Sequence, residues 1–417
     1  MKRWATIPIF FLAALLLAPL AAHAQGVTSA NIRGTVVDEN GDPLPGVNVV
    51  AVHEPSGSQY GSSTDEDGQF TLANVRVGGP YTVTASFVGY QSKQETNLQL
   101  DLGETRELQF TLREQTQELD EIEVVAEGVG AIFSEQRKGL STNISEDEIQ
   151  TAPTIDRSIA DFARFTPQAV VGNNDDDGSS ISIAGQNNRY NSIFIDGAVS
   201  NDVFGLSAQG TDGGQTGATP ISVDAIEQFN IDISPYDVTQ SYFGGGAINA
   251  VTRSGTNEYK GSFAFQYRDE NFAEDLPSAP FPEFTNERYV GRFGGPIVED
   301  ELFFFVNFDL NREASPQPFE GGFDNFQGTA IQSESDVNDL LNFIDGTLGD
   351  RYSPGEYRGQ ETTLESNKFL GKIDWNISQN HRLAARYSYS NSENVDAFGG
   401  DAATRSFPIR RRSRLWS

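Results

Sequence analysis

Apolar and polar residues alternate along several segments in the second half of the sequence. In KGSFAFQYRDE, Phe263, Phe265 and Tyr267 alternate with small or polar residues, and NKFLGKIDWNI shows the same period around Ile373 and Trp375. Because successive side chains of a β-strand point to opposite faces, this period of two predicts strands with one apolar and one polar face. We expect about five such strands, near residues 260–270, 288–293, 302–310, 367–377 and 381–390.

The N-terminal part shows a second pattern, in which short strand-like runs are separated by turn residues. Asn40-Gly41 and Asp67-Gly68 are typical turn pairs, and no helical period of apolar residues occurs between residues 31 and 114. Several short strands at this spacing predict a β-sandwich. Its strands are expected at residues 32–37, 47–52, 69–72, 81–87 and 106–112.

Between these two parts, residues 134–253 combine helical and strand patterns. Ser145, followed three residues later by Glu148, has the pattern of a capping box at the start of a helix. Strand-like runs follow it, so we expect a mixed α+β domain. The apolar stripe of the helical segment consists of Ile159, Phe162, Ala163 and Phe165, and the strands are expected at residues 180–184, 192–195 and 225–233.

The first residues of the chain have the pattern of an export signal. Lys2 and Arg3 precede an apolar run over residues 7–20, and small residues follow it up to Ala24. The run is shorter than the roughly 20 residues that a membrane-spanning helix needs. We therefore predict a secretory signal over residues 1–24, cleaved after Ala24, rather than an uncleaved anchor.

Composition narrows the possible partners. The chain contains no cysteine, so it forms neither disulfides nor thiolate metal sites. Its net charge of −30 and pI near 4.3 argue against a nucleic-acid partner, because phosphate binding needs a basic face. The same acidity is compatible with a halophilic source, since salt screens repulsion between like charges.

The sequence is also poor in the residues that enzymes use. After removal of the signal, His53 and His381 are its two histidines and no cysteine is present, so both catalytic triads and histidine metal sites lack parts. We interpret His53 as a lone surface histidine, and FGGGAIN lacks the lysine of a phosphate-binding loop. We expect no catalytic residue, metal or cofactor. An enzyme that carries the sandwich as an accessory module stays an alternative.

Two segments resemble known families. RGTVVDENGDPLPGVNV, TDEDGQFTL and YTVTASFVGYQ resemble the carboxypeptidase regulatory-like domain, which is a transthyretin-like sandwich. SIAGQNNRYNSIFIDGAVSNDVFGL and QFNIDISPYDVTQSYFGGGAINAVTRSGTNEYKG resemble the plug domain of TonB-dependent outer-membrane receptors, in its Oar-like branch. The second resemblance covers nearly all of residues 134–265. It implies a plug seated in a transmembrane β-barrel.

The resemblance singles out a set of plug residues. Glycines in this set allow tight turns and close backbone approach in a crowded lumen. These residues either only hold the plug together, or Arg189 also faces the external vestibule and touches the solute. The set consists of Gly185, Asn187, Arg189, Asp196, Gly197, Gly244, Gly246 and Asn249.

The acidic run NNDDDG at residues 173–178 spaces its oxygens like a calcium-binding loop. It lacks the downstream bidentate glutamate of an EF-hand. We therefore interpret it as a solvated acidic loop.

The hexapeptide EIEVVA is an isolated strand candidate before the plug. The resemblance implies that it is the TonB box, a peptide that adds a strand to the sheet of a periplasmic energy transducer. Such strand addition needs backbone groups without partners and β-forming side chains. An extra strand of the sandwich, or the first strand of the plug, remains an alternative. The residues are Glu121, Ile122, Glu123, Val124, Val125 and Ala126.

Together these patterns predict a mainly β protein. The resemblance to TonB-dependent receptors implies that it lies in the outer membrane and imports a solute into the periplasm. Its expected partners are a TonB-type periplasmic energy transducer, outer-membrane lipid and an extracellular solute of open identity, with no nucleic acid. The expected division is a signal at 1–24, a sandwich at 25–114, a linker with the TonB box at 115–133, a plug at 134–253 and a partial barrel at 254–417.

The number of predicted barrel strands is small for this family, whose barrels have about 22. The tail FPIRRRSRLWS is rich in arginine and lacks the expected terminal aromatic strand. We therefore expect a truncated or frame-shifted fragment that cannot close a barrel alone. A secreted β-domain surface or adhesion protein without transport, and a non-functional receptor fragment, stay as alternatives.

Overall fold

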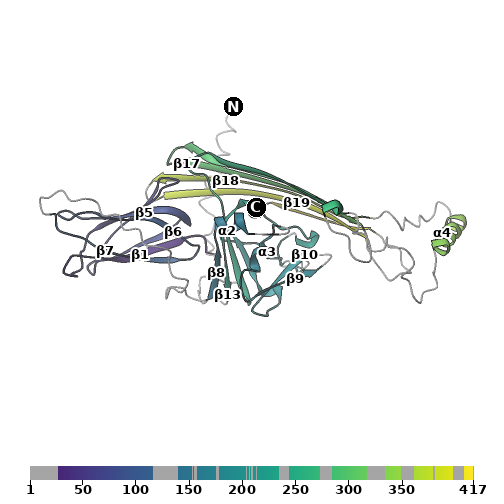
Figure 1. Ribbon diagram of the computed structural model, residues 1–417, viewed down its shortest axis with the longest axis horizontal. Helices are drawn as coiled ribbons and strands as arrows, with labels where there is room; N and C mark the ends of the chain where they lie inside the picture. Colours follow the sequence, from purple (N-terminus) through teal and green to yellow (C-terminus); the bar gives the residue numbers. More distant parts are fainter. Residues whose placement is uncertain are drawn as a thin grey trace, which may run out of the picture.

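The computed structural model describes residues 27–115, residues 140–233 with short gaps, and residues 244–272, 284–316, 334–348, 361–378, 381–397 and 408–416. Three β-rich parts lie against one another (Figure 1). We call them the sandwich (residues 27–115), the central domain (residues 140–253) and the long sheet (strands β15 to β20). In Figure 1 the long sheet covers both the sandwich and the central domain along one side.

The sandwich consists of a three-stranded sheet in the order β4-β1-β7 and a four-stranded sheet in the order β3-β2-β5-β6. Its core is apolar and includes Ile32, Phe70, Tyr81 and Phe110. Two strands, β3 and β6, were not predicted, because SQYGSS and KQETNLQL contain few apolar residues. The strands are β1 Ala30–Val37, β2 Asn48–His53, β3 Ser58–Ser63, β4 Gln69–Val75, β5 Gly78–Ser86, β6 Lys93–Leu100 and β7 Thr105–Thr111.

The interpretation of His53 as a surface residue is wrong. His53 is only 2% exposed, because it falls on the inward-facing positions of β2 together with Val49 and Ala51. Its Nδ1 lies 2.7 Å from Ser56 Oγ, and its ring packs against Tyr81. Burial, and next to it the positive charge of Arg76, lowers the pKa of His53 to about 3.

The central domain is a mixed sheet in the order β12-β11-β14-β13-β8 with a β9–β10 hairpin and short helices packed on it. Ser145 and Glu148 form the predicted capping box of α2. Phe165, placed in the apolar stripe, is 50% exposed because α3 ends two residues before it. The elements are β8 Leu140–Ile144, α2 Glu146–Thr151, α3 Ile159–Ala163, β9 Ala169–Asn174, β10 Gly178–Ile183, η1 Asn188–Tyr190, β11 Ser192–Ile195, β12 Ala198–Val199, η2 Gly214–Thr216, η3 Val223–Ala225, β13 Ile226–Ile233 and β14 Gly246–Thr252.

The long sheet is antiparallel, and each strand pairs with the next one along the chain. It has six strands where about five were predicted; the additional one, β20, lies in the arginine-rich tail and pairs with the edge of β19. A further helix, α4, lies between β17 and β18. The elements are β15 Lys260–Asp269, η4 Glu270–Phe272, β16 Thr285–Val298, β17 Leu302–Pro316, α4 Glu334–Leu348, β18 Glu361–Ser378, β19 His381–Ala397 and β20 Pro408–Trp416.

The connection between β16 and β17 is short, because β16 extends to Val298 and β17 begins at Leu302. Gly294, Gly295 and Pro296 continue β16 and pair with Phe305, Phe304 and Phe303. A bulge after Pro296 then precedes the turn. In the part of the chain that the structure describes, no helix is long and apolar enough to span a membrane.

Candidate functional site

The two faces of the long sheet have opposite polarity. One face carries exposed aromatic and aliphatic side chains, as the alternation predicted. The other face buries polar and charged side chains against the central domain, which is the reverse of a soluble sheet and typical of a barrel wall. The exposed face includes Phe263, Phe265, Phe293, Ile373, Trp375, Ile377, Leu383 and Tyr387, and the buried face includes Arg288, Asn307, Asp309, Lys368, Lys372 and Ser392.

The buried charges on the inner face have partners. Arg288 forms a two-pronged ion pair with Asp309, with N–O distances of 3.0 and 2.6 Å, and the Asp309 side chain is fully buried. Lys368 Nζ donates a hydrogen bond of 3.0 Å to Thr219 Oγ1 in the central domain. Buried charges are tolerated only when they are paired in this way. The Arg288–Asp309 pair thus stabilises the inner face itself, and the Lys368 contact joins this face to the central domain.

Contacts along β18 and β19 show which parts of the central domain lie nearer to each end of the long sheet. Lys372 Nζ donates to the carbonyl oxygen of Thr252 over 2.9 Å, and Arg386 Nη1 lies 3.0 Å from Asp196 Oδ2. Six residues further along β19, Ser392 Oγ lies 2.6 Å from Thr216 Oγ1. At about 3.4 Å per residue, η2 thus lies about 20 Å nearer than Asp196 to the end of the sheet from which α4 extends (Figure 1).

Asp196 connects the central domain to the long sheet. Its carboxylate accepts hydrogen bonds from Thr252 N (2.8 Å) and Thr252 Oγ1 (2.7 Å) as well as from Arg386. Burial by itself raises the pKa of Asp196, but the charge of Lys372, the Thr252 bonds and the charge of Arg386 outweigh it and lower the pKa. Asp196 and Gly197 both have positive φ, 48° and 79°, at the turn after β11.

Gly244, Gly246 and Asn249 lie on or beside β14. The Gly244 amide donates to the Tyr190 carbonyl over 2.8 Å, and the Gly246 amide donates to Asn191 Oδ1 over 3.1 Å. Asn249, 1% exposed, accepts a bond of 3.1 Å from the amide of Val27 in the sandwich. Phe243, directly before Gly244, lies outside the described residues.

The pairing of β11 with β14 brings two of the predicted groups together. Phe194 lies opposite Asn249, so the Asp196 turn lies near the end of β14. Sequence reasoning missed Asn191, which is buried and donates to the Ile181 carbonyl over 2.6 Å while accepting from Gly246. The signal available was an asparagine directly before the strand SIFI, in which three of four residues are apolar.

Gly185, Asn187 and Arg189 form a separate group in an exposed segment before β11. Gly185 has φ 74°, and Asn187 Oδ1 accepts from the Arg189 amide over 3.0 Å as the cap of η1. Arg189 Nη2 donates to the Gly205 carbonyl over 2.9 Å. The exposed Arg189 side chain is thus fixed against the segment that leads to η2.

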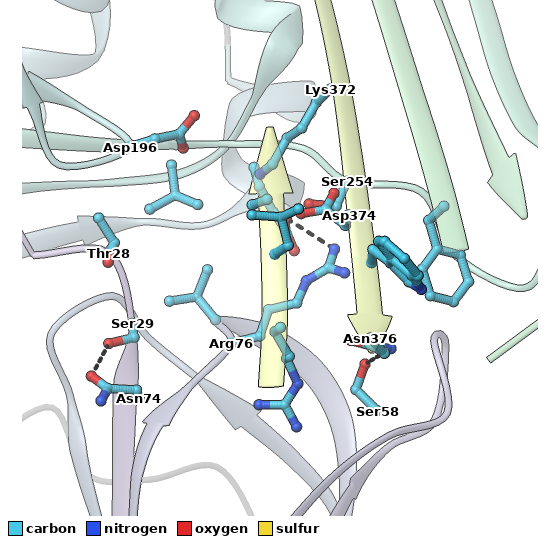
Figure 2. Close-up of a pocket in the computed structure, with 18 of the residues that line it drawn as sticks. Thr28, Ser29, Ser58, Asn74, Arg76, Asp196, Ser254, Lys372, Asp374 and Asn376 are labelled. Atoms are coloured by element: carbon cyan, nitrogen blue, oxygen red, sulfur yellow. Dashed lines mark hydrogen bonds and ion pairs between the residues drawn. The ribbon is translucent and has the colours of Figure 1, made fainter. Parts of the chain in front are cut away.

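A cavity of about 700 Å³ lies where the three parts of the molecule meet (Figure 2). Figure 2 shows Arg76 pointing from the sandwich toward Asp374, and Asn376 pointing to Ser58. Lys372 and Asp196 line the opposite side. Charged side chains from all three parts therefore meet in one place.

The predicted TonB box and part of the acidic run lie outside the described residues. Residues 121–126 lie between residues 116 and 139, outside the described residues, and so do residues 175–177 of the acidic run. Within the described parts of the chain, no three His, Cys, Asp or Glu side chains are grouped as metal ligands.

Three family matches follow one another along the chain. Residues 31–113 match the family described as Carboxypeptidase regulatory-like domain, and residues 134–251 match TonB-dependent Receptor Plug Domain. Residues 251–323 match Outer membrane beta barrel domain, so the long sheet belongs to the outer membrane.

Individual proteins are similar over part of their length. The TonB-dependent transporter Oar of Myxococcus xanthus is 26% identical over 89% of this chain and 34% of its own length. The TonB-dependent receptor SusC of Bacteroides thetaiotaomicron is 25% identical over 60% of this chain and 24% of its own. The chain thus spans about a third of the length of the first relative and about a quarter of the second.

Among solved structures, the outer membrane transporter YddB of Escherichia coli is similar with a TM-score of 0.42 and 16% identity, over 62% of this chain and 33% of that one. The siderophore receptor PirA of Acinetobacter baumannii gives a TM-score of 0.40 and 18% identity, over 66% and 44%. The proteins named here are transporters and receptors. With a regulatory-like sandwich, a plug and an outer-membrane barrel sheet in this order, the chain belongs to the TonB-dependent receptors.

Proposed function

We propose that the chain acts in an outer-membrane transporter that binds an extracellular solute and imports it into the periplasm with energy transduced from the inner membrane. One observation carries the proposal: the central domain is held by the polar inner face of a sheet whose outer face is apolar. This is the arrangement of a stopper inside a lipid-embedded wall. The 89% coverage by the Myxococcus xanthus relative supports the Oar-like branch.

We place the solute contact at Arg189. Barrels of this kind have short periplasmic turns and long extracellular loops, so the α4 end of the long sheet faces outward. Arg189 is tied to Gly205, in the segment leading to η2, which contacts β19 toward that end. Exposed Arg189, Asn187 and Tyr190 then offer guanidinium, amide and aromatic groups to a solute. The remaining members of the predicted set hold the central domain together.

We place the coupling to the energy transducer at residues 121–126. The segment joins the sandwich to the central domain, and its β-forming residues Ile122, Val124 and Val125 suit strand addition to a partner sheet. The proposed division of the chain remains 1–24, 25–114, 115–133, 134–253 and 254–417. We propose no catalytic step, cofactor or metal, in keeping with relatives that are transporters and receptors.

The test compares two variants of the membrane-inserted receptor, Val124→Pro and Val124→Ile. Proline removes a backbone N–H and blocks strand pairing, whereas isoleucine keeps the β-forming character. We expect Val124→Pro to lose binding to the periplasmic domain of the cell's own TonB-type protein, measured by titration calorimetry, and Val124→Ile to keep it. Equal binding by both variants refutes the coupling role of this segment.

Import itself is followed by mass spectrometry of a complex growth medium. Cells with the Val124→Ile receptor should deplete at least one solute that cells with the Val124→Pro receptor leave in the medium. Equal amounts of both variants in the isolated outer-membrane fraction verify that both reach the membrane. If no component of the medium differs between the two strains, the import proposal fails.

A further inference from the structure

The sandwich is docked onto the rest of the molecule through one of its ends. Arg76 Nη2 lies 3.3 Å from Glu227 Oε2 of the central domain, and the Leu102 amide donates to Gln228 Oε1 over 3.1 Å. Val27 reaches Asn249 as described above. A small apolar cluster of Val77, Leu102 and Val251, with Val27 packed on it, joins the same two parts.

These contacts fall on the middle strand of the central sheet, β14, and on its neighbour β13. Glu227 and Gln228 belong to β13, while Asn249 and Val251 belong to β14. The two strands pair with each other along their whole length. A body that holds both strands restrains the whole central sheet.

A second group of contacts fixes the sandwich to the long sheet. Asn376 Nδ2 donates to Ser58 Oγ over 3.0 Å, and the guanidinium carbon of Arg382 lies 3.7 Å from the centre of the Tyr60 ring. The Asn257 amide, in the connection that leads into β15, donates to the Pro55 carbonyl over 2.8 Å. Asn376 and Arg382 lie beside the short connection between β18 and β19, at the end opposite α4 (Figure 1).

The sandwich therefore contacts both the central domain and the long sheet, at the end of the long sheet where β18 connects to β19. Ser58, Tyr60 and Arg76 of the sandwich line the cavity together with Asp196, Lys372 and Asp374 (Figure 2). The Asp196 and Lys372 contacts that hold the central domain to the long sheet thus lie directly behind the docked sandwich. Any shift of β14 relative to β18 changes both sets of contacts.

The docking has the character of a reversible interface. Its apolar part is limited to the small cluster around Leu102, and its remaining contacts are mostly single hydrogen bonds. Arg76 is held by one nitrogen at 3.3 Å, and its buried Nε makes no hydrogen bond within the described part of the chain. Interfaces that are polar and small between domains permit relative motion.

We propose that the sandwich is a reversible clamp. When docked it holds β13 and β14 against the β18–β19 end of the long sheet, and it must leave this position before the central domain can shift. The role of that shift in import rests on the proposed function; the clamp itself does not.

Docking is tested by a cysteine pair, for which the cysteine-free chain gives a clean background. Ser58→Cys with Asn376→Cys joins two side chains in contact. Asn40→Cys with Asn376→Cys is the matched control, because Asn40 lies beyond the far end of β1, about 23 Å along that strand from Ala30. We expect mild oxidation of outer membranes to cross-link the first pair at least tenfold faster than the second. Equal rates overturn the docking.

The hold on the central sheet is tested by reversing one charge. Arg76→Glu places two carboxylates together, and Arg76→Glu with Glu227→Arg restores an opposite pair. The backbone of Arg76 stays anchored by Tyr60 Oη and Tyr81 Oη, at 3.1 and 2.7 Å, so the sandwich itself is expected to fold. Arg33→Glu is the matched control, since its partner Glu107 lies within the sandwich.

The readout is amide hydrogen exchange in the detergent-solubilised receptor. We expect Arg76→Glu to speed exchange in β13 and β14 at least tenfold, the charge swap to restore it, and the control to leave it unchanged. Closing the Ser58–Asn376 cysteine pair should slow the same amides, and reductant should reverse this. Unchanged β13 and β14 exchange in Arg76→Glu, with protected β2 and β5, overturns the clamp.

These measurements contain neither solute nor energy transducer. A receptor in which the clamp is present but Val124→Pro binds the periplasmic domain normally therefore refutes the coupling proposal alone. A receptor with the opposite results refutes the clamp alone.

Discussion

Replacing Gly246 by alanine should destabilise the central domain by about 2 kcal/mol, the middle of the range for overpacked core positions. A Cβ at this position would lie 2.5 Å from Ile183 Cδ1, 2.7 Å from Ile183 Cγ2 and 2.9 Å from the Asp232 carbonyl oxygen. Carbon atoms normally approach to about 3.5 Å, so the Ile183 contacts are too close by nearly 1 Å. Ile183 is fully buried, and the β13 backbone is fixed by its pairing with β14, so neither neighbour moves easily.

Gly244→Ala is the matched control for this prediction. A Cβ there would meet Tyr190 at 3.7 Å, which is an ordinary contact. Urea unfolding followed by hydrogen exchange of β13 and β14 should separate the two variants, with Gly244→Ala within about 0.5 kcal/mol of the wild type. Equal free energies of unfolding for the two variants would show that close approach at Gly246 is not what requires glycine.

Three further predictions concern other parts of the molecule. His53 has a lowered pKa, so the unfolded state binds more protons than the folded state between pH 6.5 and about 3. The free energy of unfolding of the sandwich should therefore fall as pH decreases through this window, by up to about 1.4 kcal/mol per pH unit. His53→Gln should reduce this pH dependence, measured by hydrogen exchange of the β2 amides. A double-mutant cycle of Asp196→Ala and Arg386→Ala should give a coupling of about 1–3 kcal/mol, since their 3.0 Å pair has side-chain exposures of only 22% and 17%; a coupling near zero would contradict a direct interaction. Ile373→Arg, on the apolar outer face, should destabilise the inserted sheet by about 2–4 kcal/mol in lipid vesicles, whereas the same change at the exposed sandwich residue Val88 should have little effect on urea unfolding.

Local sequence patterns predicted the strands that have one apolar and one polar face, and the helix start that is set by neighbouring residues. In the long sheet, the alternation around Ile373 and Trp375 identified the strands and the two faces, because the period of a strand is fixed by its backbone. The capping box at Ser145 was predicted for a similar reason, since its two hydrogen bonds join residues three apart. The helix α4 could also have been found, because Leu340, Leu341 and Ile344 recur at helical spacing.

The sequence patterns did not predict strands that form mainly by pairing with a neighbouring strand. The strands β3 and β6 are polar and owe their structure to pairing with β2 and β5. The edge of β19 similarly pairs with β20, whose sequence has no alternation. His53 was misplaced because a single histidine in an apolar run does not show whether its strand face is covered.

The sequence by itself determined the order of the three domains, the polarity of the two faces of the long sheet and the glycines required at tight turns, because each of these depends on residues close together in the chain. The tertiary structure alone decided the partners of the polar groups. Asp196 meets Thr252 and Arg386, and Arg76 meets Glu227, across separations of 56, 190 and 151 residues. A buried charge needs a partner, but only the packing of the three parts selects which one it receives.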